Sequence, residues 1–194
     1  MKFSESVYDA LFKPAIAMRQ IAAEKNLKHS FAVFLLSMAV SLGTLFYGLK
    51  LTHMDGMMPV FVFGQIAVGL FQWFLGTAVL ALTSELFGGS GSALGLFAAR
   101  GYTHLPRLFL PVFSLLTIAA GAGGRVFCLS ISGLLLFGWT FYLDFQAIKG
   151  AYALSGAKAM LVMLFPLLAA GAFAAILFIL MGAWLASWLP GHLL

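Results

Sequence analysis

Charge is scarce in this sequence, acidic charge most of all, and cysteine is almost absent. Only 9% of the 194 residues are charged, with 6 Asp and Glu against 11 Lys and Arg. Because 62% of the residues are hydrophobic, a soluble domain of this length could not cover its apolar surface. The lone Cys128 excludes an intrachain disulfide. The composition therefore indicates a membrane protein.

Long apolar segments separated by short loops make up most of the chain. A bilayer core of roughly 30 Å takes about 20 helical residues to cross. The segments are continuously apolar and do not alternate, which favours helices over barrel strands. The sequence predicts an all-α, polytopic integral membrane protein. We expect five transmembrane helices, at about residues 31–49, 58–83, 107–122, 126–148 and 159–189.

The first and last segments need separate treatment. Residues 1–28 are predicted to be a cytoplasmic or interfacial segment, and residues 29–194 the transmembrane domain. Pro14 suits the first turn of a helix. An apolar stripe on that helix favours an interfacial helix over a frayed tail, and its members are Ile16, Ala17, Ile21 and Ala22. The fifth run would reach roughly 45 Å as a straight helix, so we expect a kink at Pro166 or a separate interfacial piece before it.

Lys and Arg are distributed unevenly between alternate loops. Nine lie on the side of the N-terminus, and two, Lys50 and Arg125, lie on the other side. The positive-inside rule then predicts a cytoplasmic N-terminus and, with five spans, a C-terminus outside. Since the basic residues report orientation, the net charge of +5 gives no reason to expect nucleic acid as a partner.

A glycine-serine loop follows the second span. It comprises Gly88, Gly89, Ser90, Gly91 and Ser92. Glycine-rich backbone can bind anions, and Ser92 can cap the following helix. With Arg100 and Arg107 nearby in sequence, the loop is a candidate site for a lipid headgroup or another anion; the alternative is a plain tight turn. The loop lacks a Gly-Lys-Ser nucleotide motif, and Ser90 has no histidine base at membrane depth.

Deep polar residues occur in the second span. Gln65, Gly69, Gln72 and Gly76 form a single helical stripe. Small residues and amides on one face favour close helix packing, while a polar path for a solute is the alternative. The carboxylates of Glu85 and Asp144 are expected at the membrane boundary, with water or lysine as their partner.

The sequence contains little that indicates a metal site, a cofactor site or a catalytic site. The segment from His53 to Met58 holds imidazole and thioether groups that suit copper(I), but it is one short patch without a second ligand cluster. We therefore predict no metal site, no cofactor and no catalytic residues, and we expect the protein not to be an enzyme.

Three motif stretches occur in a characteristic order and spacing. They are Ala10 to Pro14; Leu86 to Ser92 with Gly101-Tyr102 and Leu105-Pro106; and Trp139 to Tyr142 with Gly150 to Ala159 and Pro166. Their order resembles the bacterial branch of the Yip (Ypt-interacting protein) membrane family. The positions that carry the resemblance are Pro14, Pro106, Tyr142, Gly150, Tyr152, Lys158 and Pro166.

The resemblance implies five membrane helices, a cytoplasmic N-terminus and a bacterial inner membrane. Eukaryotic members are linked to Rab-type GTPases, but this sequence shows no long cytoplasmic N-terminal domain, so that role is not transferred. We expect lipid handling or membrane organisation, with a small-solute or ion transporter or channel, acting as an oligomer, as the alternative. We expect membrane lipids as partners. A second copy of the chain or another membrane protein is a further candidate.

Overall fold

The computed structural model describes residues 2–51 and 53–188, and every regular element within them is helical. The elements are α1 (Phe3–Phe12), α2 (Pro14–Glu24), α3 (Leu27–Leu51), η1 (Asp55–Met57), α4 (Met58–Leu86), α5 (Ala93–Tyr102), η2 (Leu105–Phe109), α6 (Leu110–Ala119), α7 (Gly121–Tyr152) and α8 (Gly156–Trp188). The predicted all-α class is confirmed for these residues.

Among the described residues, four helical segments are long and apolar enough to cross a membrane. They are Leu27–Lys50, Met58–Leu86, Gly123–Tyr152 and Gly156–Met181. These segments correspond to the first, second, fourth and fifth predicted spans. The last residue of the predicted fifth span, 189, lies outside the described residues.

The predicted third span, 107–122, is not one uninterrupted helix. A 3-10 turn covers Leu105–Phe109, α6 has only 10 residues, and Gly121 turns the chain into α7 with a φ of +63°. Pro106 and Pro111 supply no backbone donor, which accounts for the irregular start, and Gly121 tolerates the positive φ. At 1.5 Å per residue α6 alone reaches about 15 Å, half of a hydrocarbon core.

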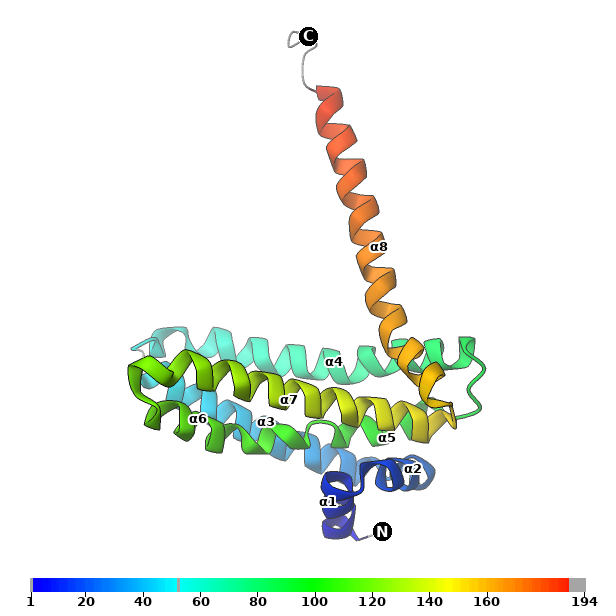
Figure 1. Cartoon of the computed structure of the whole chain (residues 1–194), viewed down its shortest axis with the longest axis horizontal. Helices are drawn as coiled ribbons and strands as arrows, with labels where there is room; N and C mark the ends of the chain where they lie inside the picture. The colour runs from blue at the N-terminus through cyan, green and yellow to red at the C-terminus, as the bar shows by residue number, and fades with distance from the viewer. Residues whose placement is uncertain (1, 52, 189–194) are drawn as a thin grey trace.

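Most of the helices form an elongated bundle. In Figure 1, α3, α4 and α7 run along its length, and α5, η2 and α6 follow one another in the same direction. A large apolar core lies at one end of the bundle, where α2, α5 and α7 meet through Met18, Leu96, Ala147 and Tyr152. Here this end is called the α2 end.

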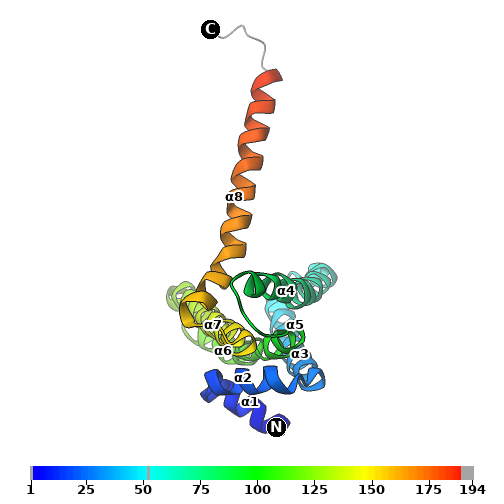
Figure 2. The ribbon, with the colours of Figure 1, turned by 90° about the vertical axis from the view of Figure 1, so that its right-hand side faces the viewer.

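The N-terminal helices lie across the α2 end. Figure 2 shows α2 crosswise to the bundle, with α1 beneath it. Pro14 occupies the first turn of α2, as predicted. The buried stripe differs from the predicted one, because Met18 is buried in place of the exposed Ile16. A Cβ on Gly150 would lie 2.8 Å from the backbone nitrogen of Arg19, so glycine there permits the close crossing of α2 over α7.

Helix α8 leaves the bundle. It is continuous through Pro166, and Figures 1 and 2 show it changing direction in its first turns before it projects away crosswise to α4 and α7. Phe165 packs against Phe87 with ring centroids 5.8 Å apart. Residues 153–155 form the joint between α7 and α8. A flat bilayer crossed by α3, α4 and α7 would not be crossed by α8 in this arrangement.

Candidate functional site

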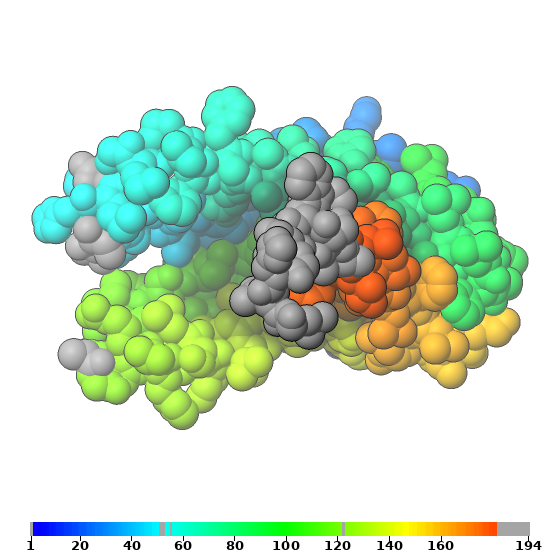
Figure 3. Space-filling view, turned by 90° about the horizontal axis from the view of Figure 1, so that it is seen from above, coloured from blue at the N-terminus to red at the C-terminus, as the bar shows by residue number. Residues whose placement is uncertain are grey.

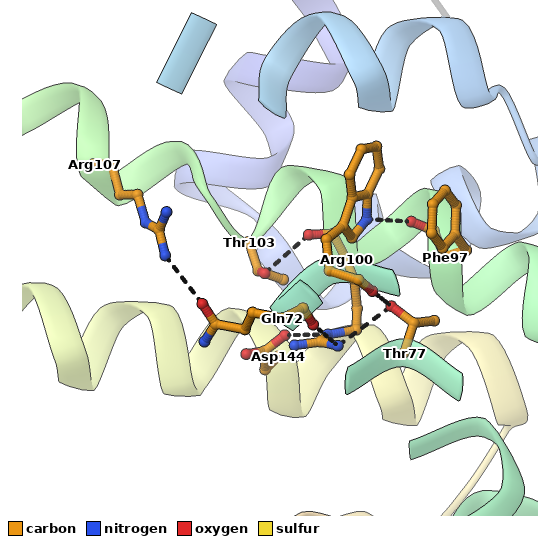
Figure 4. A network of polar contacts seen from close by, with 8 residues as sticks. Gln72, Thr77, Phe97, Arg100, Thr103, Arg107 and Asp144 are labelled. Atoms are coloured by element: carbon orange, nitrogen blue, oxygen red, sulfur yellow. Dashed lines mark hydrogen bonds and ion pairs between the residues drawn. The ribbon is translucent and has the colours of Figure 1, made fainter. Parts of the chain in front are cut away.

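A buried arginine joins three helices at the centre of the bundle. Arg100, on α5, is 6% exposed. Its Nε donates to Oδ1 of Asp144 on α7 at 3.0 Å. Its Nη1 donates to the Gln72 carbonyl and the Thr77 hydroxyl of α4, both at 3.2 Å (Figure 4). Hydrogen bonds to a charged group are stronger than those between neutral groups, so these three bonds hold α4, α5 and α7 together.

Local sequence features hold α5 in place for this contact. The Ser92 hydroxyl accepts from the Gly95 nitrogen at 3.1 Å, so the predicted helix cap is confirmed. Ser30 of α3 donates to the Ala98 carbonyl at 2.7 Å. A Cβ on Gly101 would lie 2.6 Å from the Ser30 Cβ, so glycine there permits the approach of α3 to α5.

Aromatic rings and a histidine enclose the network on one side. The Trp73 ring stacks on Phe34 and Phe97, with centroids 4.6 and 4.5 Å away. Its Nε1 donates to the Phe97 carbonyl at 3.2 Å. His104 is 5% exposed, and its ring makes a T-shaped contact with the ring of Phe34. Within the described part of the chain its Nδ1 has no hydrogen-bond partner.

A pocket of about 420 Å³ lies beside the network, between α3, α4, η2, α6 and α7. Its polar lining residues are Ser41, Gln65, Gln72, Arg107 and Thr140. Arg107 Nη2 donates to the Gln72 Oε1 at 3.3 Å (Figure 4). Figure 3 shows a hollow between α4 (cyan) and α7 (yellow-green), on the face from which α8 projects. The pocket thus combines a lining that contains polar groups with an opening between two apolar helices.

The predicted stripe of the second span serves both packing and the pocket. A Cβ on Gly69 would lie 2.4 Å from Met38 Cε, and one on Gly76 2.8 Å from Arg100 Nη1. Both glycines therefore permit close approach of another residue, as the packing interpretation requires. Gln65 and Gln72 line the pocket, as the polar alternative requires.

The predicted lipid-binding set is not brought together. The Ser90 nitrogen donates to the Tyr152 carbonyl at 3.1 Å, and a Cβ on Gly91 would lie 2.1 Å from the Ala151 oxygen. The loop is therefore packed on the end of α7. Arg100 contacts α4 near Gly76, about three helical turns before the loop. Of the two arginines, only Arg107 lines the pocket.

Two carboxylates have partners other than those expected. The prediction that Asp144 pairs with water or lysine is wrong, because Asp144 pairs with Arg100, 44 residues earlier in the sequence. Glu85 accepts a hydrogen bond from the Tyr152 hydroxyl at 3.3 Å. No signal in the sequence joins Arg100 to Asp144, because the pair depends on how α5 and α7 pack.

The remaining motif positions frame the bundle. Tyr152 is fully buried, and Pro106 is buried in η2, whereas Tyr142 is exposed. A Cβ on Gly88, where φ is +79°, would lie 3.6 Å from Lys158 Nζ, which places Lys158 beside the loop.

Among the described residues no group of three or more His, Cys, Asp or Glu could hold a metal ion.

Comparison with known proteins identifies the family. The Yip1 domain matches residues 8–179, from within α1 to within α8. The chain belongs to the Yip1 domain family. With its apolar helices, this membership makes it a multi-pass membrane protein. No curated protein and no solved structure matches the chain. The buried network and the pocket both lie within the Yip1 domain.

Proposed function

We propose that this Yip1 domain protein is a non-enzymatic protein of a bacterial inner membrane that handles phospholipids. The observation that supports this is the polar pocket inside the bundle, which opens between α4 and α7. Val68 and Phe137, at the pocket's edge, are apolar and well exposed. A phospholipid could place its headgroup in the pocket and leave its acyl chains among such side chains.

The proposal includes five membrane crossings, with α5, η2 and α6 as a discontinuous third crossing. Irregular backbone at membrane depth is tolerated where it lines a cavity, and η2 lines the pocket through Arg107. Discontinuous helices also form the binding sites of many transporters. Two of the nine basic residues assigned to the side of the N-terminus, Arg100 and Arg107, lie in the bundle. The other seven, against two on the opposite side, support a cytoplasmic N-terminus and a periplasmic C-terminus.

A pocket-filling variant tests the proposal. Val68→Trp places a large ring at the pocket's edge, while Val126→Trp places the same ring on an exposed part of α7 that does not line the pocket. Both variants would be cross-linked to a photoactivatable phospholipid in nanodiscs, and the labelled peptides identified. We expect labelling of pocket-lining peptides in the parent and in Val126→Trp, and its loss in Val68→Trp. Equal labelling in all three proteins would overturn the proposal.

The alternative, an oligomeric transporter of small solutes or ions, draws support from the same polar groups. Gln65, Gln72 and Arg107 line the pocket, and polar residues within a membrane protein can mark a solute path. Flux of a small anion through liposomes containing the protein, without lipid labelling in the pocket, would favour this alternative.

A further inference from the structure

We infer that the pocket binds its ligand as an anion, a phosphate group held by Arg107, and that it selects phospholipids whose headgroup carries no ammonium. This inference rests on the proposed lipid handling and names the lipid class. It differs from the predicted headgroup site, since neither the glycine-serine loop nor Arg100 takes part.

The charge balance of the bundle interior provides the first argument. Arg100 is matched by Asp144 at 3.0 Å. Asp144 also attracts Arg107, but its ion pair is with Arg100. In the described part of the chain Arg107 pairs with no carboxylate, and its hydrogen-bond acceptor is the neutral amide of Gln72. A charge inside a membrane protein is costly unless it is paired. One positive charge therefore remains for a ligand to neutralise.

The other polar groups of the pocket suit the oxygens of a phosphate. Gln65 and Gln72 carry amide donors, and Ser41 and Thr140 carry hydroxyl donors. Ser41 is 4% exposed, and its Oγ has no hydrogen-bond partner in the described residues. A buried polar atom without a partner is unfavourable, so a ligand oxygen at this position would satisfy it. A guanidinium is well suited to phosphate because it can donate two parallel bonds.

The same lining argues against a cationic or zwitterionic group. No Asp or Glu lines the pocket, so the ammonium of a choline or ethanolamine headgroup would find no countercharge there. Arg107 would also repel it. The apolar walls, which include Leu136 and Phe137, favour a lipid over a free anion, since they give acyl chains a surface outside the polar part.

Lipid binding measured by native mass spectrometry tests this inference. The parent would be titrated with phosphatidylglycerol and with phosphatidylcholine of equal acyl length, and with free glycerol phosphate as a competitor. We expect phosphatidylglycerol to bind more tightly. Arg107→Gln should reduce this preference by about tenfold, because it removes a charge-assisted bond. Arg19→Gln, an equal loss of charge at an exposed position of α2, should leave the preference unchanged.

The outcomes separate the inference from the proposed function. Equal binding of both lipids in the parent, with labelling in the pocket, would overturn the inference and leave lipid handling intact. Binding of neither lipid would overturn both. Competition by glycerol phosphate as strong as that by the lipid would identify a free anion as the ligand and contradict lipid handling. If Arg107→Gln does not fold, Ser41→Ala and Arg107→Lys serve instead. Ser41→Ala should weaken phosphatidylglycerol binding, and Arg107→Lys should retain the preference for phosphatidylglycerol. Unchanged binding in Ser41→Ala, or loss of the preference in Arg107→Lys, would count against the site.

Discussion

Replacing Asp144 by Asn should destabilise the bundle strongly, because it leaves the buried Arg100 charge without its partner. Arg100 is 6% exposed, and the Nε to Oδ1 distance is 3.0 Å. Breaking a buried ion pair from one side costs about 3–5 kcal/mol. The Asp144 side chain is 15% exposed, and Asn keeps one acceptor oxygen. We therefore expect a loss of about 3 kcal/mol in the free energy of unfolding, at the lower end of that range.

The assay is equilibrium unfolding in mixed micelles, with the proportion of denaturing detergent as the variable. The exposed Lys149, on the same helix, supplies the control: Lys149→Gln should change the free energy of unfolding by no more than about 0.5 kcal/mol. Arg100→Gln combined with Asp144→Asn should cost at least about 1 kcal/mol less than the sum of the single changes. An Asp144→Asn protein as stable as Lys149→Gln, or strictly additive changes, would refute the reasoning.

Three further predictions follow from the packing and the topology. Gly76→Ala should destabilise the protein more than Gly69→Ala in the same assay, because the new methyl group meets the bonded Arg100 guanidinium in one case and the flexible end of Met38 in the other; the reverse order would contradict this. A reporter active only in the periplasm should be active when fused after Leu194, and an inactive fusion of a stably expressed protein would contradict five crossings. In nanodiscs α8 should turn at residues 153–155 and run beside α4. Spin labels at Val68 and Phe173, in a Cys128→Ser background, should then lie closer together than they do when α8 projects away from the bundle. A distance between the labels that matches the projecting arrangement would contradict this.

The apolar spans could be predicted from the sequence because run length and hydropathy are local properties. Ser92 as a helix cap and Pro14 as a helix start are local as well, and both are found. The interruption of the helix within residues 107–122 has a local signal in Pro106 and Pro111, which supply no backbone donor, but apolar content alone predicts one continuous segment there.

The candidate site could be predicted only in part. The stripe of Gln65 and Gln72 marks one wall of the pocket, and periodicity within a single helix is enough to find it. The pairing of Arg100 with Asp144 depends on α5 and α7 meeting, and their separation of 44 residues leaves no pattern in the sequence. The glycine-serine loop shows the limit of local composition: its glycines permit packing on α7, composition alone does not distinguish packing from anion binding, and anion binding at the loop stays a prediction.

The central claim is that a phospholipid headgroup occupies the pocket between α4 and α7. An experimental structure of the protein in nanodiscs that contain phosphatidylglycerol tests it most directly. The account predicts non-protein density in the pocket within hydrogen-bond distance of the Arg107 guanidinium, continuous with acyl-chain density between α4 and α7. A pocket closed by side chains, or lipid density confined to the outer surface of the bundle, would contradict it.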